Sequence, residues 1–182
     1  YEEAFFWLED ARISNLCYAS TDPIVGLSLN KEYRSLKSYM ADTGLLVTLA
    51  FADKDTTAET VYRSILRGNI GMNEGMLVEN LVAQMLVAAG HKLFFYSQSG
   101  HKEGEERMEI DFLITRPYTD AAGKPRISPI EVKSPRQYGT TSLDRFKNKF
   151  GKRIGTQYVL HPKQMKIEND RVYLPLYMGW CL

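Results

Sequence analysis

Apolar and polar positions alternate along two short stretches in the second half of the chain, and this pattern predicts two strands. In residues 109–114 the two-residue period of a strand places Ile110, Phe112 and Ile114 on one face, and Asp111 projects from the other. In residues 129–133 the apolar side chains again share a face, while Glu131 and Lys133 share the opposite one. If the two strands are antiparallel neighbours, these three polar side chains converge at one edge of a sheet.

Helical spacing of apolar residues predicts a helix over residues 72–89, which ends at Gly90. Glu79 lies on the flank of its apolar stripe. The connection over residues 116–128 contains Pro, Asp and Gly residues and is predicted to be a turn. The remaining elements expected in this half are strands at residues 92–97, 108–114, 127–134 and 156–161, and a helix at 142–150.

The first part of the chain, residues 1–69, shows weaker patterns. Asp42 is placed to cap a helix that follows it. The set suits a winged-helix-like unit, but its candidate helices are apolar or mixed rather than basic, which favours a packing or interdomain role over direct DNA reading. The expected elements are a helix at 1–10, strands at 13–18 and 33–40, a helix at 56–66, and a hinge at 67–69 into a second module at 70–182.

Composition is that of an ordinary globular protein. Of 182 residues, 44% are hydrophobic and 25% are charged. There is no apolar run near the roughly 18–20 residues needed to cross a bilayer and no secretory signal pattern, so a cytoplasmic location without membrane contact is expected. Cys17 and Cys181 are expected to be packed thiols, and the three histidines lie too far apart in sequence to predict a zinc site.

The two carboxylates suggest a specific chemistry. Mg²⁺ or Mn²⁺ prefers oxygen ligands, and one or two carboxylates plus a substrate phosphate are a sufficient site, so Asp111 and Glu131 are the expected metal ligands. Lys133 could orient or deprotonate the attacking water. The alternative is that Glu131 and Lys133 are ordinary charges on the solvated face of a sheet.

Basic residues gather around this region, although the net charge of the chain is only +1. Contacts between such residues and phosphates would give salt-sensitive binding of DNA that is independent of sequence. A solvated helix face beside a loop is the alternative interpretation. The residues concerned are Lys124, Arg126, Lys133, Arg136, Arg145, Lys147, Lys149, Lys152 and Arg153.

From about Gly75 onwards, the order helix, three strands, helix, strand, together with Asp111 and the Glu131-x-Lys133 pair, resembles the PD-(D/E)XK nuclease superfamily. The resemblance implies an α/β fold of the restriction-endonuclease-like type, a mixed sheet flanked by helices. It also implies that Glu79, on the first core helix, assists the metal site. One departure is that Ile110, rather than proline, precedes Asp111.

A second resemblance spans nearly the whole chain. The segments WLEDARIS, KSYMADTGLL, GMLVENLVAQML, EIDFLI, PIEVKSP and LPLYMGW are similar, in this order, to the C-terminal half of a prokaryotic family of AAA-type ATPases. This resemblance implies that an ATPase module precedes a winged-helix-like segment and a nuclease-like domain of unassigned function. The chain contains no phosphate-binding loop, so ATP would be bound by a module outside it.

Two functional classes follow from the sequence. One is a Mg²⁺-dependent DNA phosphodiesterase with Asp111, Glu131, Lys133 and Glu79 at its site. The other is a non-catalytic nuclease-like module that holds nucleic acid or a protein partner for the ATPase, and an oligomer is compatible with either.

Overall fold

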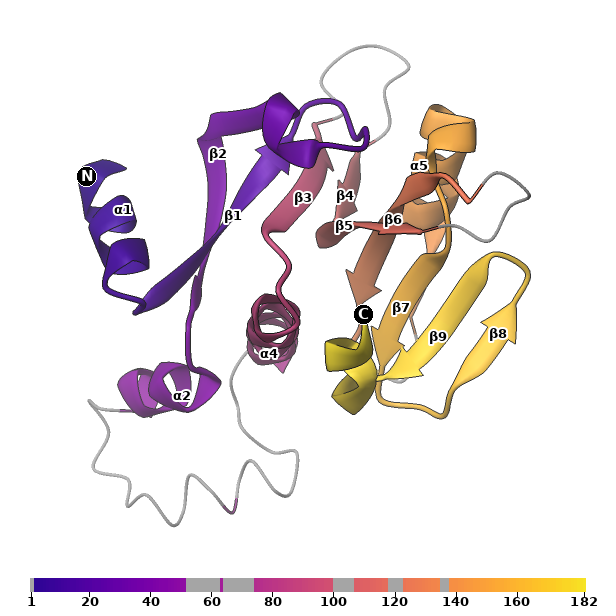
Figure 1. The fold of residues 1–182 in the computed structure, drawn as a ribbon. Coiled ribbons are helices and arrows are strands. Elements are labelled where there is room, and N and C mark those ends of the chain that lie inside the picture. The colour runs from indigo at the N-terminus through magenta and orange to yellow at the C-terminus, as the bar shows by residue number, and fades with distance from the viewer. Residues whose placement is uncertain (1, 52–62, 64–73, 100–106, 118–122, 135–137) are drawn as a thin grey trace.

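The alternating strands form two mixed sheets in the computed structural model, which describes residues 2–51, 63, 74–99, 107–117, 123–134 and 138–182 (Figure 1). The first sheet has the strand order β2 (Lys31–Met40), β1 (Ser14–Ser20), β3 (Leu93–Gln98), β4 (Met108–Ile110). The second has the order β5 (Phe112–Pro117), β6 (Pro125–Val132), β7 (Gln157–His161), β9 (Arg171–Pro175), β8 (Lys166–Glu168). The α/β class expected from the sequence is therefore confirmed.

Helices cover both faces of this arrangement. Val82 and Leu86 of α4 pack in one hydrophobic cluster, and Leu143 and Phe146 of α5 pack in the other. We call these the α4 cluster and the α5 cluster. The helices are α1 (Glu2–Asp10), α2 (Thr43–Phe51), α4 (Glu74–Ala88) and α5 (Thr141–Phe150), with short 3₁₀ turns η1 (Leu27–Asn30), η2 (Gly151–Arg153) and η3 (Leu176–Cys181).

The predicted strand over residues 108–114 is broken at Asp111. The chain bends there, so that Ile110 pairs with Tyr96 in the first sheet and Phe112 pairs with Ile130 in the second. Ile110 consequently packs in the α5 cluster, whereas Phe112 packs in the α4 cluster. The expectation that these two side chains share a face was wrong, because the bend interrupts the two-residue period of the strand.

The predicted turn at residues 116–128 was too long. Strand β5 continues to Pro117 and β6 already begins at Pro125, and these two residues are paired across the hairpin. The connection itself, residues 118–122, lies outside the described residues. Strands β8 and β9 and the turn η3 were not anticipated, and Asn169 at the β8–β9 turn adopts the left-handed conformation that asparagine tolerates.

The beginning of the chain is tied to its middle by strand pairing. Strand β1 pairs with β3 in parallel, with Tyr18 opposite Phe94. The predicted helix at 56–66, apart from residue 63, and the hinge at 67–69 lie outside the described residues, and the winged-helix-like arrangement stays a prediction. The sheet nonetheless joins strands from both sides of the predicted boundary at residue 69.

Asn80 fastens α4 to β2. Its Oδ1 accepts a hydrogen bond from Met40 N at 2.8 Å, and its Nδ2 donates to Met40 O at 3.1 Å and to Thr43 Oγ1 at 3.0 Å. The side chain is 2% exposed, so these bonds satisfy polar groups that water cannot reach. Leu45 N donates to Asp42 Oδ1 at 2.8 Å, which confirms the predicted cap of α2.

Candidate functional site

Glu131 and Lys133 lie on the same face of the end of β6, as the alternation predicted. Lys133 Nζ is 2.9 Å from Glu131 Oε2. The Glu131 side chain is only 2% exposed, and this burial raises the pKa of its carboxyl group, although the nearby Lys133 ammonium opposes the increase. The pair is therefore a buried carboxylate with a half-buried ammonium beside it, not two solvated surface charges.

Asp111 lies one residue beyond the Phe112–Ile130 pair, in line with Glu131 on the neighbouring strand. Its Oδ2 accepts a hydrogen bond from Val132 N at 2.8 Å, which fixes the side chain against β6. Burial and the charge of Glu79 raise the pKa of Asp111 to about 7, and Glu131 adds a smaller contribution in the same direction. The bend thus brings Asp111 among like charges, which disfavour its ionised form.

Glu79 projects from α4 towards strand β2. Lys37 Nζ donates a hydrogen bond to Glu79 Oε1 at 3.1 Å, and Tyr39 Oη donates to the same oxygen. Lys37 Nζ also lies 2.8 Å from Glu109 Oε1 on β4. We call Glu79, Glu109 and Asp111, with Lys37 among them, the carboxylate cluster.

The structure therefore divides the four predicted site residues into two groups. Among the charged groups, Glu79 has the largest effect on the pKa of Asp111. The pKa of Glu131 responds instead to Lys133 and, to a smaller extent, to Arg171 of β9. The described part of the chain contains no group of three or more His, Cys, Asp or Glu side chains placed to hold a metal ion. A cation bound at Asp111 and Glu131 would take its other ligands from water and substrate, as Mg²⁺ commonly does.

Three residues near the site were missed by sequence reasoning. Lys37 and Tyr39 come from β2, some forty positions before Glu79, and no local pattern marks them. Arg171 Nη2 donates to Gln157 Oε1 at 3.0 Å and to Asp144 Oδ1 at 2.6 Å. Strand β9, which positions Arg171, was itself not anticipated.

A tyrosine–histidine pair lies at the end of β7, the strand beside β6. The Tyr138 hydroxyl is 2.6 Å from His161 Nδ1, and Nε2 of the same ring is 3.2 Å from Gln164 O. The His161 residue is 3% exposed, and burial lowers its pKa. Both ring nitrogens are thus occupied by protein partners, which suits a structural imidazole.

Part of the predicted basic surface is used within the fold. Lys147 Nζ lies 2.5 Å from Asp170 Oδ2, and Arg153 Nη1 lies 2.6 Å from Asp22 Oδ1. Lys149 Nζ donates a hydrogen bond to Tyr96 Oη at 2.9 Å. Arg136 lies outside the described residues. Fewer of these charges are therefore available for phosphates than the sequence suggested.

Fold and site together define an α/β protein with acidic side chains gathered where two mixed sheets meet. Residues 74–178 match the family model described as a domain of unknown function, DUF4143, and the chain belongs to this family. The domain is often found C-terminal to AAA-type ATPases. No curated protein and no solved structure matches the chain. No helix among the described residues is long and apolar enough to cross a membrane.

Proposed function

We propose that this chain carries a Mg²⁺-dependent phosphodiesterase site that acts on DNA, with Asp111 and Glu131 as metal ligands. The observation that carries the proposal is that Asp111, at the bend before β5, lies beside the end of β6, which carries Glu131, and that both carboxyl groups have raised pKa values. Folding brings acidic groups together at a cost, and strongly perturbed carboxylates of this kind are enriched at functional sites. A divalent cation would offset that cost.

An unsatisfied oxygen supports the fit of a cation. Glu131 Oε2 is buried and, despite its 2.9 Å ion pair with Lys133, forms no aligned hydrogen bond within the described structure. A carboxylate oxygen has more than one lone pair, so Oε2 can stay beside the Lys133 ammonium and still offer a lone pair to a cation. Bound Mg²⁺ would supply Lewis-acid stabilisation of charge on a phosphate.

The protein side chains would have distinct roles at this site. Lys133, held in place because its backbone N–H donates to Leu160 O at 2.8 Å, would orient the attacking water through its ammonium group. Glu79 would assist the metal site indirectly, because its charge raises the pKa of Asp111. Asp111 would keep its position through the hydrogen bond from Val132 N.

The order of elements also supports the proposal. Helix α4 is followed by β3, the broken strand β4–β5, β6, α5 and β7. This is the order of the restriction-endonuclease-like core. DNA would then be the substrate, and ATP would be bound by an ATPase module that precedes this region in the full protein.

One observation favours the second candidate, a non-catalytic module that binds nucleic acid or a protein partner. Lys37 already places an ammonium group among Glu79 and Glu109, at 3.1 and 2.8 Å, and so supplies positive charge without a metal. In that case the carboxylate cluster would serve to join β2, α4 and β4.

Calorimetric titration with Mn²⁺ and Mg²⁺ distinguishes the two candidates, because metal binding requires neither the correct substrate nor the ATPase. We expect binding to the wild-type chain that is lost in Glu131→Gln and retained in a control, Glu168→Gln, on the exposed strand β8. If the wild type binds no metal, with or without a short DNA duplex, the phosphodiesterase proposal is wrong. If metal binds, Mg²⁺-dependent cleavage of plasmid DNA should be lost in Lys133→Met.

A further inference from the structure

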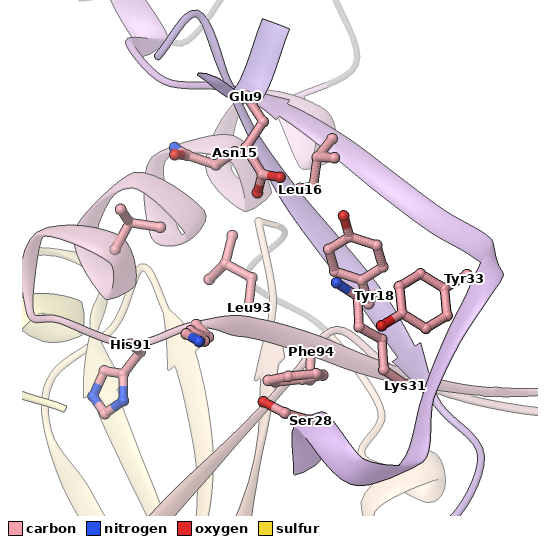
Figure 2. Close-up of a pocket in the computed structure, with 12 residues that line it drawn as sticks. Glu9, Asn15, Leu16, Tyr18, Ser28, Lys31, Tyr33, His91, Leu93 and Phe94 are labelled. Carbon is pink, nitrogen blue, oxygen red and sulfur yellow. The ribbon is translucent and has the colours of Figure 1, made fainter. Parts of the chain in front are cut away.

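A cavity of about 430 Å³ opens between the end of α1, strands β1 and β2, and the start of β3 (Figure 2). Its volume is in the range of small-molecule sites. Apolar side chains such as Leu16 and Phe94 contribute to its wall, and Glu9, Asn15 and Ser28 add polar groups. We call this cavity the α1 pocket.

The ammonium group of Lys31 contacts two aromatic rings of the α1 pocket. Its Nζ lies 3.2 Å from the centroid of the Tyr18 ring and 4.8 Å from that of Tyr33, and Figure 2 shows the Lys31 side chain beside these rings. The Tyr18 and Tyr33 rings are 6.2 Å apart in an edge-to-face arrangement. Such contacts fix the position of the ammonium group, and its N–H donors form no hydrogen bond with another residue that the structure describes.

A second ammonium group, that of Lys92, lines the same cavity. Among the residues that the structure describes, neither Lys31 nor Lys92 lies within ion-pair distance of a carboxylate. Burial lowers the pKa of Lys31, and Lys92 contributes to this decrease while Glu9 opposes it. Two positive charges without ion pairs in one pocket favour an anionic ligand.

The α1 pocket is separate from the carboxylate cluster. Tyr18 packs in the α5 cluster, whereas the preceding residue, Cys17, packs in the α4 cluster and lies close enough to Glu79 and Asp111 for their charges to influence its thiol. The two sites therefore use opposite faces of β1. A ligand in the pocket would not occupy the proposed phosphodiesterase site.

We propose that the α1 pocket binds a nucleoside monophosphate, with its phosphate on Lys31 and Lys92 and its base against the ring of Tyr33. Tyr33 is 65% exposed, so its ring offers a face for stacking that the fold does not use. Asn15 and Ser28 can form hydrogen bonds with the base or sugar. Glu9 adds a negative charge to the wall, which favours one phosphate over a longer polyphosphate.

Calorimetry with AMP, adenosine and inorganic phosphate, all in the presence of EDTA, tests the proposal. We expect AMP to bind with submillimolar affinity, and adenosine and phosphate each to bind at least tenfold more weakly. Lys31→Ala should weaken AMP binding at least tenfold, Lys31→Arg should preserve most of it, and the exposed control Lys166→Ala should not change it. Equal binding of AMP and phosphate, or no effect of Lys31→Ala, would overturn the proposal.

Two further measurements define the ligand. Tyr33→Leu should weaken AMP binding several-fold without changing the thermal melt, because the ring is mostly exposed, and an unchanged affinity would refute the stacking contact. A 5′-phosphorylated oligothymidylate carries a nucleoside monophosphate at the end of a strand. Its binding, compared with that of AMP, distinguishes a pocket for a strand end from a pocket for a free nucleotide. Glu131→Gln should bind AMP as the wild type does, so failure of the metal site and failure of this pocket are distinguishable.

Discussion

Replacing Asp111 with asparagine should stabilise the metal-free protein at alkaline pH. The substitution removes a negative charge that Glu79 and Glu131 oppose. The asparagine Oδ1 can still accept the hydrogen bond that Val132 N donates at 2.8 Å in the wild type. The change therefore tests the electrostatic cost of ionised Asp111 while preserving its contact with β6.

The size of the effect follows from the pKa. In the folded state the pKa of Asp111 is raised to about 7 from its ordinary value of 3.8, so the folded protein binds more protons than the unfolded chain between these values. The wild type therefore loses stability as pH rises through this range, by about 4 kcal/mol in all. Because Asp111 is partly exposed and water screens its charge, we expect about 2 kcal/mol.

Urea unfolding in EDTA between pH 5 and pH 8.5 measures this difference. The advantage of Asp111→Asn over the wild type should grow with pH and level off above about pH 8. The exposed Asp10→Asn serves as the control for removal of a carboxylate from the surface. A variant no more stable than the wild type at pH 8.5, or a constant difference, would refute the reasoning. Saturating Mg²⁺ should narrow the gap if the wild type binds it.

Three other substitutions test the remaining contacts. Lys133→Met leaves Glu131 buried without its charge partner, and should lower the free energy of unfolding at pH 8 by about 2–3 kcal/mol; an unchanged urea midpoint would contradict a buried ion pair. Asn80→Ala removes three hydrogen bonds and leaves both backbone groups of Met40 without their side-chain partner, at a cost of about 3 kcal/mol in a thermal melt. If its Tm equals that of the exposed control Asp10→Asn, Asn80 does not fasten α4 to β2. Tyr138→Phe should lower the free energy of unfolding by about 1 kcal/mol, because the hydrogen bond to His161 is lost. The pH titration of His161, followed by NMR, should also differ from that of the wild type, and an identical titration would argue against the contact.

Periodic patterns were sufficient to predict the elements that pack on one consistent face. Helices α4 and α5 follow from the spacing of their apolar residues, although the buried face of α4 also includes Asn80, which an apolar pattern does not predict. The shared orientation of Glu131 and Lys133 is the part of the candidate site that local sequence determines.

The rest of the site depends on contacts that no local pattern contains. Ile110, Phe112 and Ile114 keep the two-residue spacing of a single strand, so their pattern does not mark the bend that moves Ile110 into the other cluster. Lys37 and Tyr39 reach Glu79 only after β2 and α4 have docked, through contacts about forty residues apart in sequence. Arg171 could not be placed at the site from sequence, because its strand, β9, is mostly half-buried and shows no clear alternation.

The parallel pairing of β1 with β3 has a consequence for any attempt to isolate the family domain. Residues 74–178 include β3 but exclude β1 and β2, so a shortened chain with these bounds would leave one edge of β3 without its hydrogen-bonding neighbour. An open edge of this kind recruits strands from other molecules. Leu93, Phe94, Phe95 and Tyr96, now at most 5% exposed, would lose part of their cover at the same edge. Residues 74–178 alone are therefore expected to self-associate, because strand β1, which covers this edge of β3 in the longer chain, is missing from them.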